Sequence, residues 1–377
     1  MTIQGTSSDI SLEPAGLLDI DHERLVIRHD PESGMRLAIA VHSTALGPAL
    51  GGLRLRAYPG GMQDAVSDVL ALARTMTLKA SAAGLDLGGG KAVMVDDGGA
   101  ADPEVRRARL EAAADAIDEL AGAYITAEDI GTTTDDIDLM AGRTRYAVGR
   151  SVASGGGGDP SPVTAETVFR AMRCGLAAAT GSDDLDGRTV GVIGLGKVGG
   201  RLAEMVARAG ARVIVCDLDA ARAERFRDEH GGEVAPSAEA VIATELDVLA
   251  PCAAGGMIDQ AIAGGLAASV VCGAANNPVA DRATARRLAE RGILYVPDFL
   301  ANCGGLIHVE TEWRRLDGGA DLPRAARVEE GIGRAMERLE VALVVADRDG
   351  AVPLEIAERQ ALERVRMARA EGVRAAA

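Results

Sequence analysis

The N-terminal part of the chain alternates between apolar runs and segments with helical spacing. Apolar runs at residues 25–28 and 36–42 flank an Asp-Pro-Glu-Ser-Gly segment, which predicts a hairpin with a turn-rich tip. Residues 62–82 carry apolar side chains at helical spacing and are followed by Gly84, which predicts a helix with a glycine C-cap. A Gly-Gly-Gly segment then predicts a turn that leads into a buried strand over residues 91–95.

The pattern changes near the middle of the chain. Residues 154–162, rich in Gly, Ser and Pro, predict a hinge between two domains. Beyond it apolar strands alternate with helices, which is typical of a parallel, doubly wound sheet. The predicted strands are residues 189–193, 212–216, 246–249, 270–272 and 293–296.

We therefore expect an α/β protein of two domains separated by a cleft. Residues 1–149 would form an α/β domain, and residues 150–345 a Rossmann domain with a doubly wound sheet. The charged helical tail, residues 346–377, would pack back on the first domain. The length of 377 residues also favours two domains over one.

Composition excludes several classes of partner. The net charge of −16 disfavours nucleic acid, because binding to phosphates requires clustered Lys and Arg, and it repels anionic membranes. The chain shows neither a signal peptide nor an apolar run long enough for a membrane helix, so we expect a cytoplasmic protein. Five scattered cysteines and five scattered histidines predict neither a disulfide framework nor a metal site.

A glycine motif follows the first strand of the second domain. The sequence Gly-Leu-Gly-Lys-Val-Gly lies between a predicted strand and a predicted helix, the context that dinucleotide binding requires. Its glycines would make a tight turn, let a pyrophosphate approach the backbone and let helix and strand pack closely. The alternative is a glycine turn without a ligand. The residues expected to bind the cofactor are Gly194, Leu195, Gly196, Lys197, Val198, Gly199 and Gly200.

The next predicted strand ends at Asp217. A carboxylate at this position binds the ribose hydroxyls of NAD and repels the 2′-phosphate of NADP, so the sequence predicts NAD as the cofactor. The alternative role for Asp217 is to cap the N-terminus of the following helix.

Three charged positions in the first domain lie on otherwise apolar elements. Lys79 is near the end of the predicted helix, Lys91 begins the predicted strand, and Glu128-Asp129 follow a strand-like segment. A buried ammonium group must be paired, so lysines at such positions are unusual. The alternative is that each lysine extends its charged end to the surface.

Taken together, these motifs resemble the Glu/Leu/Phe/Val dehydrogenase family, most closely its leucine and valine dehydrogenases. The resemblance runs from about residue 47 to about residue 357 and departs from the family at residues 313–323. At Cys303, alanine is usual in the family. The motifs, in family order, are GGGKAV, ITAEDIGT, PSPVTA, GxGxxG, APCA, GAANN and PDFLANCGG.

The resemblance implies roles for the charged positions. Lys91 would be the base that activates water, Asp129 would move protons to and from the amino group, and Lys79 would hold the substrate carboxylate. Glu128 would be a structural neighbour. A lysine base must be desolvated or lie close to another cation, and Lys79 is the cation we expect beside Lys91. Further implied contacts are Asn277 and Gly51 with the substrate, and Thr164 and Asn276 near the nicotinamide.

The resemblance also implies an apolar pocket for the substrate side chain, lined by Leu50, Ala127, Leu306 and Val309. Glutamate-specific relatives have a lysine at the position of Leu50. The expected reaction is NAD-dependent, reversible oxidative deamination of Val, Leu or Ile to the 2-oxo acid and ammonia, by a homo-oligomer (a dimer or an octamer). Two alternatives remain open: an aromatic amino-acid dehydrogenase, such as a phenylalanine dehydrogenase, and a catalytically silent NAD-binding regulatory protein.

Overall fold

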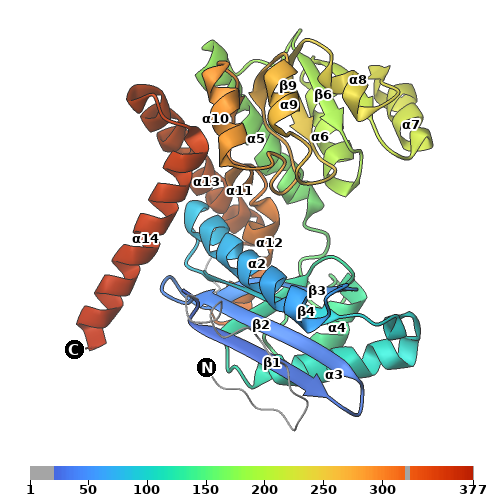
Figure 1. Cartoon of the computed structure of the whole chain (residues 1–377), viewed down its shortest axis with the longest axis vertical. Coiled ribbons are helices and arrows are strands. Elements are labelled where there is room, and N and C mark those ends of the chain that lie inside the picture. Colours follow the sequence, from blue (N-terminus) through green and yellow to red (C-terminus); the bar gives the residue numbers. More distant parts are fainter. Residues whose placement is uncertain (1–20, 319–322, 377) are drawn as a thin grey trace.

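The computed structural model describes residues 21–318 and 323–376, which contain two separate β-sheets (Figure 1). The first sheet has the order β1-β2-β4-β3-β5, in which β2 is antiparallel to both β1 and β4, and β3 is parallel to both β4 and β5. The strands are β1 (Arg24–Asp30), β2 (Met35–Ser43), β3 (Ala49–Arg56), β4 (Gly88–Val95) and β5 (Tyr124–Glu128).

The predicted hairpin is confirmed by the antiparallel pairing of β1 with β2, and the predicted helix is α2 (Met62–Ala82). The predicted turn before Lys91 is wrong, because β4 already begins at Gly88. Each of these glycines lies against a neighbouring element. A Cβ atom would be 1.8 Å from the Ser43 carbonyl oxygen at Gly88, 2.0 Å from the Thr77 backbone nitrogen of α2 at Gly89, and 2.7 Å from the Tyr124 ring at Gly90. The glycines therefore serve close packing rather than a turn.

The second sheet is parallel and has the order β11-β10-β9-β6-β7-β8. The strand sequence reverses between β6 and β9, so the glycine motif after β6 lies at the switch point where such sheets bind ligands. All predicted strands are present, and β8 was not predicted. The strands are β6 (Thr189–Ile193), β7 (Arg212–Cys216), β8 (Glu233–Val234), β9 (Leu246–Pro251), β10 (Ala268–Val271) and β11 (Leu294–Tyr295).

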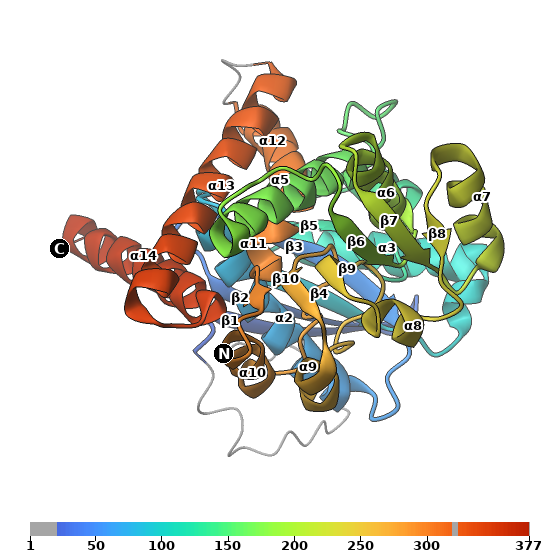
Figure 2. The ribbon, with the colours of Figure 1, turned by 90° about the horizontal axis from the view of Figure 1, so that it is seen from above.

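Different helices cover the two faces of the second sheet, as expected for a doubly wound fold (Figure 2). Helices α5 and α6 pack in one core cluster, and α8, α9 and α10 pack in another. The remaining helices of the described residues are η1 (Gly99–Ala101), α3 (Pro103–Asp118), α4 (Thr134–Ala141), α5 (Ser161–Thr180), α6 (Lys197–Arg208), α7 (Ala220–His230), α8 (Ala238–Ile242), α9 (Gln260–Gly265), α10 (Arg282–Glu290), α11 (Asp298–Ala301), α12 (Gly304–Leu316), α13 (Arg324–Asp349) and α14 (Pro353–Ala376).

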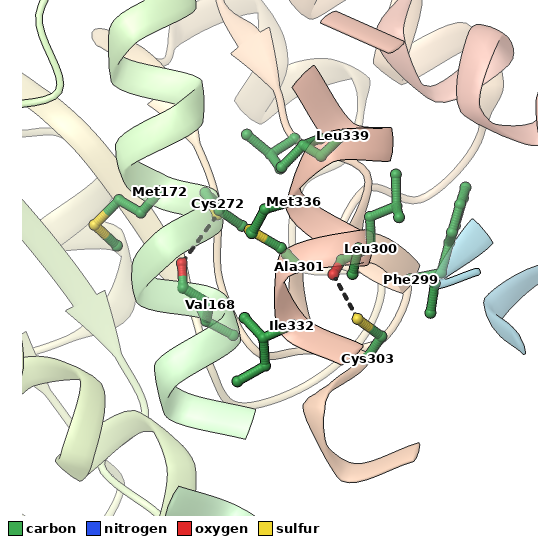
Figure 3. Packing of buried hydrophobic residues seen from close by; sticks show 14 of the residues in the cluster. Val168, Met172, Cys272, Phe299, Leu300, Ala301, Cys303, Ile332, Met336 and Leu339 are labelled. Atoms are coloured by element: carbon green, nitrogen blue, oxygen red, sulfur yellow. Dashed lines mark hydrogen bonds between the residues drawn. The ribbon is translucent and has the colours of Figure 1, made fainter. Parts of the chain in front are cut away.

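One core cluster extends from residues 150–345 to the first sheet. Val168 and Met172 of α5 pack with Ile332 and Met336 of α13 in the largest core cluster, which also includes Leu50 of the first sheet (Figure 3). Aromatic residues make up only 2% of the chain, so this core consists mainly of aliphatic side chains.

Two further contacts join segments that are far apart in the sequence. Helix α14 runs along one side of the molecule, where the Ser81 hydroxyl of α2 donates a hydrogen bond of 2.8 Å to the Ala361 carbonyl (Figure 1). The buried carboxylate of Glu312 in α12 accepts hydrogen bonds from the backbone of Gly149 and Gly157 and from Arg150. Residues 149–160 form turns without a helix or strand. Glu312 thus holds the residues just before the predicted hinge (residues 154–162) to Gly157 within it.

None of the helices in the described ranges is long and apolar enough to cross a lipid bilayer. Residues 319–322, part of the segment that departs from the family pattern, lie outside the described residues.

Candidate active site

Lys91 and Asp129 form a buried ion pair. Lys91 projects from β4 and Asp129 follows the last residue of β5, and the Lys91 Nζ lies 2.6 Å from the Asp129 Oδ2. Burial lowers the pKa of Lys91 below the ordinary lysine value, although Asp129 opposes the shift. Burial alone would raise the pKa of Asp129, but Lys91 and Arg54 outweigh it and the pKa is lowered. The pair therefore favours a carboxylate beside an amine that loses its proton more readily than an ordinary lysine.

A second cation contacts this pair. The Arg54 Nε of β3 donates a hydrogen bond of 3.3 Å to the Asp129 Oδ2, and its Nη1 donates one of 2.9 Å to the Asp68 Oδ2. Tyr58 donates its hydroxyl to the same Asp68 oxygen, at 2.5 Å. We expected Lys79 to be the cation that affects Lys91, but the cation with the largest effect on its pKa is Arg54.

Lys79 connects α2 to the second half of the molecule. Its Nζ donates a hydrogen bond of 3.2 Å to the Asn276 Oδ1, which also accepts one of 2.9 Å from the Asn302 Nδ2. Burial lowers the pKa of Lys79, while the nearby Asp298 opposes this effect. With its carbonyl oxygen occupied, Asn276 can offer its amide nitrogen to a ligand.

The neighbouring Asn277 has a left-handed backbone with φ of +48°, a conformation that asparagine tolerates better than most residues. Its backbone N–H donates a hydrogen bond of 2.9 Å to Asp298, which also accepts one of 2.7 Å from the Tyr295 hydroxyl. Asp298 thus holds the loop that carries both asparagines close to Lys79.

The four residues predicted to line the pocket belong to one apolar cluster. Leu50, Ala127, Leu306 and Val309 are each less than a tenth exposed and come from β3, β5 and α12. At Gly51, a Cβ atom would lie 1.9 Å from the Gly90 carbonyl oxygen, so a side chain at this position would force β3 and β4 apart. Thr164 lies in the first turn of α5, where its hydroxyl donates a hydrogen bond of 3.1 Å to the Pro160 carbonyl.

The glycine motif connects β6 to α6, and its glycines differ in their surroundings. Gly194 has φ of +99°, and a Cβ atom at Gly199 would lie 2.0 Å from the Gly194 carbonyl oxygen, so both positions require glycine. A Cβ atom at Gly196 would meet no protein atom within 4 Å. Gly196 therefore borders open space at the N-terminus of α6, where a pyrophosphate would fit.

Asp217 follows β7 and points back to this motif. Its Oδ2 accepts a hydrogen bond of 2.6 Å from the Leu195 N–H, and its Oδ1 accepts one of 2.8 Å from the Asp219 N–H. The alternative role of Asp217 as a helix cap is wrong, because Asp219 is the N-cap of α7. These contacts hold the Asp217 carboxylate beside the glycine motif. The residues present therefore fit an NAD cofactor.

Sequence reasoning missed four residues of this site: Arg54, Asp68, Asp298 and Asn302. One signal in the sequence could have drawn attention to the site as a whole. The chain has 40 basic residues but only three lysines (Lys79, Lys91 and Lys197), so the other 37 are arginines. Lysine therefore occurs only at the two chemical positions and in the glycine motif.

Within the described ranges, no three His, Cys, Asp or Glu side chains are grouped so that they could hold a metal ion. Cys303 is buried and donates its thiol to the Leu300 carbonyl at 3.0 Å (Figure 3). Burial raises the pKa of this thiol to about 12, with Lys79 acting in the opposite direction, so the thiol stays protonated beside the site.

Family models match most of the chain. Residues 22–146 match the Glu/Leu/Phe/Val dehydrogenase dimerisation domain, and residues 218–370 match the Glutamate/Leucine/Phenylalanine/Valine dehydrogenase domain. Residues 165–252 match the NAD-binding domain of D-isomer-specific 2-hydroxyacid dehydrogenases, in agreement with the NAD site inferred from Asp217.

Individual relatives agree with these matches. The chain is 40% identical to leucine dehydrogenase of Thermoactinomyces intermedius, over 93% of this chain and 92% of that one. It is 41% identical to valine dehydrogenase of Streptomyces virginiae, over 92% of this chain and 95% of that one. Its structure is similar to that of L-tryptophan dehydrogenase from Nostoc punctiforme, with a TM-score of 0.80, 29% identity and coverage of 94% and 99% of the two chains.

Proposed function

The chain belongs to the Glu/Leu/Phe/Val dehydrogenase family, and from this premise we propose that it catalyses the NAD-dependent, reversible oxidative deamination of a branched-chain aliphatic L-amino acid. The products would be the 2-oxo acid and ammonia. The observation that carries the proposal is the Lys91–Asp129 pair, 2.6 Å apart, on the same sheet as the apolar pocket residue Leu50.

In this proposal each charged side chain has one task. Lys79 pairs with the substrate carboxylate, and the Asp129 carboxylate takes a proton from the substrate ammonium group. NAD, when bound, would supply the acceptor for the hydride that leaves the substrate Cα. Uncharged Lys91 then takes a proton from the water that attacks the resulting iminium carbon, and the lowered pKa of Lys91 supports this role. Asp129 returns its proton to the nitrogen, and ammonia leaves as the C–N bond breaks and takes up the hydroxyl proton as ammonium. Lys91 releases the proton it took from water to the solvent, which restores the uncharged amine.

The residues assigned to the cofactor are those of the glycine motif together with Asp217, Thr164 and Asn276. Gly196 and the N-terminus of α6 would take the pyrophosphate, and Asp217 the adenosine ribose. Asn276 and Thr164 would lie near the nicotinamide, and Asn277 and Gly51 near the substrate. The Lys79–Asn276 hydrogen bond supports this assignment, because it brings α2, which carries the proposed substrate-binding Lys79, to the loop after β10.

The pocket residues support an aliphatic substrate. Leu50 is 1% exposed and belongs to an apolar cluster, so a glutamate side chain that reached it would bury a carboxylate without a cation. Such burial costs several kcal/mol, and about 1.4 kcal/mol already changes specificity tenfold. One methylene group changes the transition-state binding free energy by only ~1–3 kcal/mol, so valine, leucine and isoleucine should all react.

The decisive experiment measures NADH formation by the purified chain with L-valine, L-leucine, L-isoleucine, L-phenylalanine and L-glutamate. We expect the highest kcat/KM with one of the three branched aliphatic substrates. Glutamate as the best substrate would contradict the pocket, and phenylalanine as the best would establish the aromatic alternative. NAD binding without turnover of any amino acid would identify the silent regulatory alternative.

We also propose the organisation in which this enzyme works. Residues 1–149 together with the tail 346–377 would form the substrate and oligomerisation domain, and residues 150–345 the NAD-binding domain. The enzyme would be a cytoplasmic homo-oligomer, a dimer or an octamer, that binds neither nucleic acid nor membranes. The match of residues 22–146 to a dimerisation domain supports an oligomer. Light scattering on the purified protein tests this, and a monomer would contradict it.

A further inference from the structure

Arg54 connects the proposed catalytic pair to a second carboxylate that the proposed chemistry does not use. The guanidinium donates from Nε to Asp129 and from Nη1 to Asp68, at 3.3 and 2.9 Å. The Arg54 side chain is 14% exposed and that of Asp68 is 27% exposed, so this contact is largely shielded from water. Tyr58 completes the network with a hydrogen bond of 2.5 Å to Asp68.

Two donors converge on one oxygen of Asp129. The Lys91 Nζ at 2.6 Å and the Arg54 Nε at 3.3 Å both contact Oδ2, from neighbouring strands of the sheet. Arg54 reaches both carboxylates with a planar fork of donors, a geometry that a single ammonium group cannot reproduce. Asp68 in turn fixes the orientation of this fork from α2, the helix that also carries Lys79.

We propose that Arg54, held by Asp68 and Tyr58, is a positioning residue that fixes the Asp129 carboxylate against Lys91. This inference rests on the proposed function, because it assigns Asp129 and Lys91 to proton transfer. A carboxylate that rotates away from Lys91 would leave the substrate amino group without its proton acceptor. Misplacement of a reacting group by about 1 Å can cost roughly 100-fold in rate.

The network also has an electrostatic consequence with a defined sign. Burial and Arg54 lower the pKa of Lys91, whereas Asp129 and Asp68 raise it. Removal of the Arg54 charge should therefore raise the pKa of Lys91, and removal of the Asp68 charge should lower it. Lys79 of α2 and Asp298 of α11 also carry charge near the site and are unchanged in both variants. If Arg54 and Asp68 had merely structural roles, their removal would not shift the Lys91 pKa in opposite directions.

The scarcity of lysine makes this test direct. Protein made with lysine labelled with ¹³C at Cε has only three lysine signals, and the variants Lys79→Arg and Lys197→Arg assign that of Lys91. The Cε shift is followed against pH without substrate or NAD. We expect Lys91 to titrate at higher pH in Arg54→Met, and at lower pH in Asp68→Asn, than in the unmodified protein.

Arg36→Met is the matched control. Arg36 is on β2 of the same sheet, and its guanidinium lies 3.6 Å from Asp97 rather than on Asp129, Asp68 or Tyr58. Its loss should leave the Lys91 titration unchanged. Equal titration of Lys91 in all three variants, or shifts of the same sign in Arg54→Met and Asp68→Asn, would overturn the proposal.

Kinetic measurements then distinguish the positioning of Asp129 by Arg54 from the effect of the Arg54 charge. Arg54→Lys keeps the cation but cannot contact both carboxylates, so we expect kcat to fall about 100-fold with little change in KM for the amino acid. An unchanged kcat would overturn the positioning role. If Arg54→Met does not fold, Asp68→Asn, which keeps the side-chain volume, and Arg54→Lys carry the test. The titration needs no turnover, so a chain that failed to deaminate amino acids would still show whether Arg54 and Asp68 shift the Lys91 pKa in opposite directions.

Discussion

The part of the site on the first sheet consists of charged side chains. The part on the second sheet, the glycine motif, consists of backbone groups that border open space. Lys91 and Arg54 both contact the Asp129 carboxylate, and the charges of Arg54 and Asp129 shift the pKa of Lys91 in opposite directions. Around Gly196 no protein atom would meet an added Cβ atom, and the polar groups on offer are those of a helix N-terminus. A substitution in the first region should therefore alter chemistry, and one in the second should alter cofactor binding.

Lys91→Ala is the strongest way to test this division. Loss of a positioned base typically costs about 10²–10⁴-fold in rate, so kcat for deamination should fall by that amount. The affinity for NAD should not change, because Lys91 is on the first sheet. Steady-state kinetics and a direct NAD titration measure the two quantities on the same preparation. A variant that keeps more than about a tenth of the unmodified kcat would contradict the role of Lys91 as base.

The pH dependence of deamination should follow the same residue. Lys91 acts only when uncharged, so kcat/KM should rise about tenfold per pH unit below the Lys91 pKa and then level off. Burial lowers this pKa, so the rise should end below the ordinary lysine value of 10.5. The affinity for NAD should not follow this rise. A kcat/KM profile that is flat from about pH 7 to about 10.5 would rule out Lys91 as the base.

Parts of both regions follow from local sequence, and parts do not. The apolar spacing of residues 62–82 predicted α2 with the bounds that the structure gives, because a helix depends on neighbours within a few residues. The strand that begins at Gly88 could not be predicted this way, because its glycines are required by contacts with β2, α2 and β5, which only folding brings together. Strand β8, only two residues long, carries too short a pattern to detect.

The same distinction applies to the site. The glycine motif and Asp217 could be interpreted from spacing, and the resemblance to a family gave Lys79, Lys91 and Asp129. Arg54 was missed because its role depends on Asp68, a residue of another element that folding brings within 2.9 Å. The effect of Lys79 on Lys91 was overestimated for the same reason, since only the structure shows that Arg54 contacts the pair directly.

Two glycine substitutions compare the regions directly. A Cβ atom at Gly89 would lie 2.0 Å from a backbone atom of α2, so Gly89→Ala must displace this helix and Lys79 with it. Overpacking of this kind costs about 1–3 kcal/mol in the free energy of unfolding, and kcat should fall as well. Gly196→Ala should change the free energy of unfolding by less than about 0.5 kcal/mol, because the site is open, and should instead weaken NAD binding.

Urea denaturation and NAD titration of both variants measure these effects. Gly196 has an extended backbone with φ of −66°, which alanine adopts without strain, so any loss of NAD affinity would come from the added methyl group. A destabilised Gly196→Ala with normal NAD affinity would show that this glycine serves packing, and the contrast between the two regions would fail.

Asp217→Asn should have the smallest effect and the most specific one. In the unmodified protein the Leu195 N–H donates to the Asp217 Oδ2 at 2.6 Å. Asparagine keeps the shape of the side chain and an oxygen that can accept this hydrogen bond, so the glycine motif should keep its conformation. It removes the negative charge that repels a 2′-phosphate. We expect kcat/KM with NAD to fall roughly tenfold, which corresponds to about 1.4 kcal/mol, while kcat/KM with NADP rises. Asp219→Asn is the matched control, because Asp219 caps α7 and should affect stability rather than cofactor choice. If the unmodified enzyme already preferred NADP, or if the ratio of the two cofactors were the same in Asp217→Asn, the specificity of the second region would lie in other residues than Asp217.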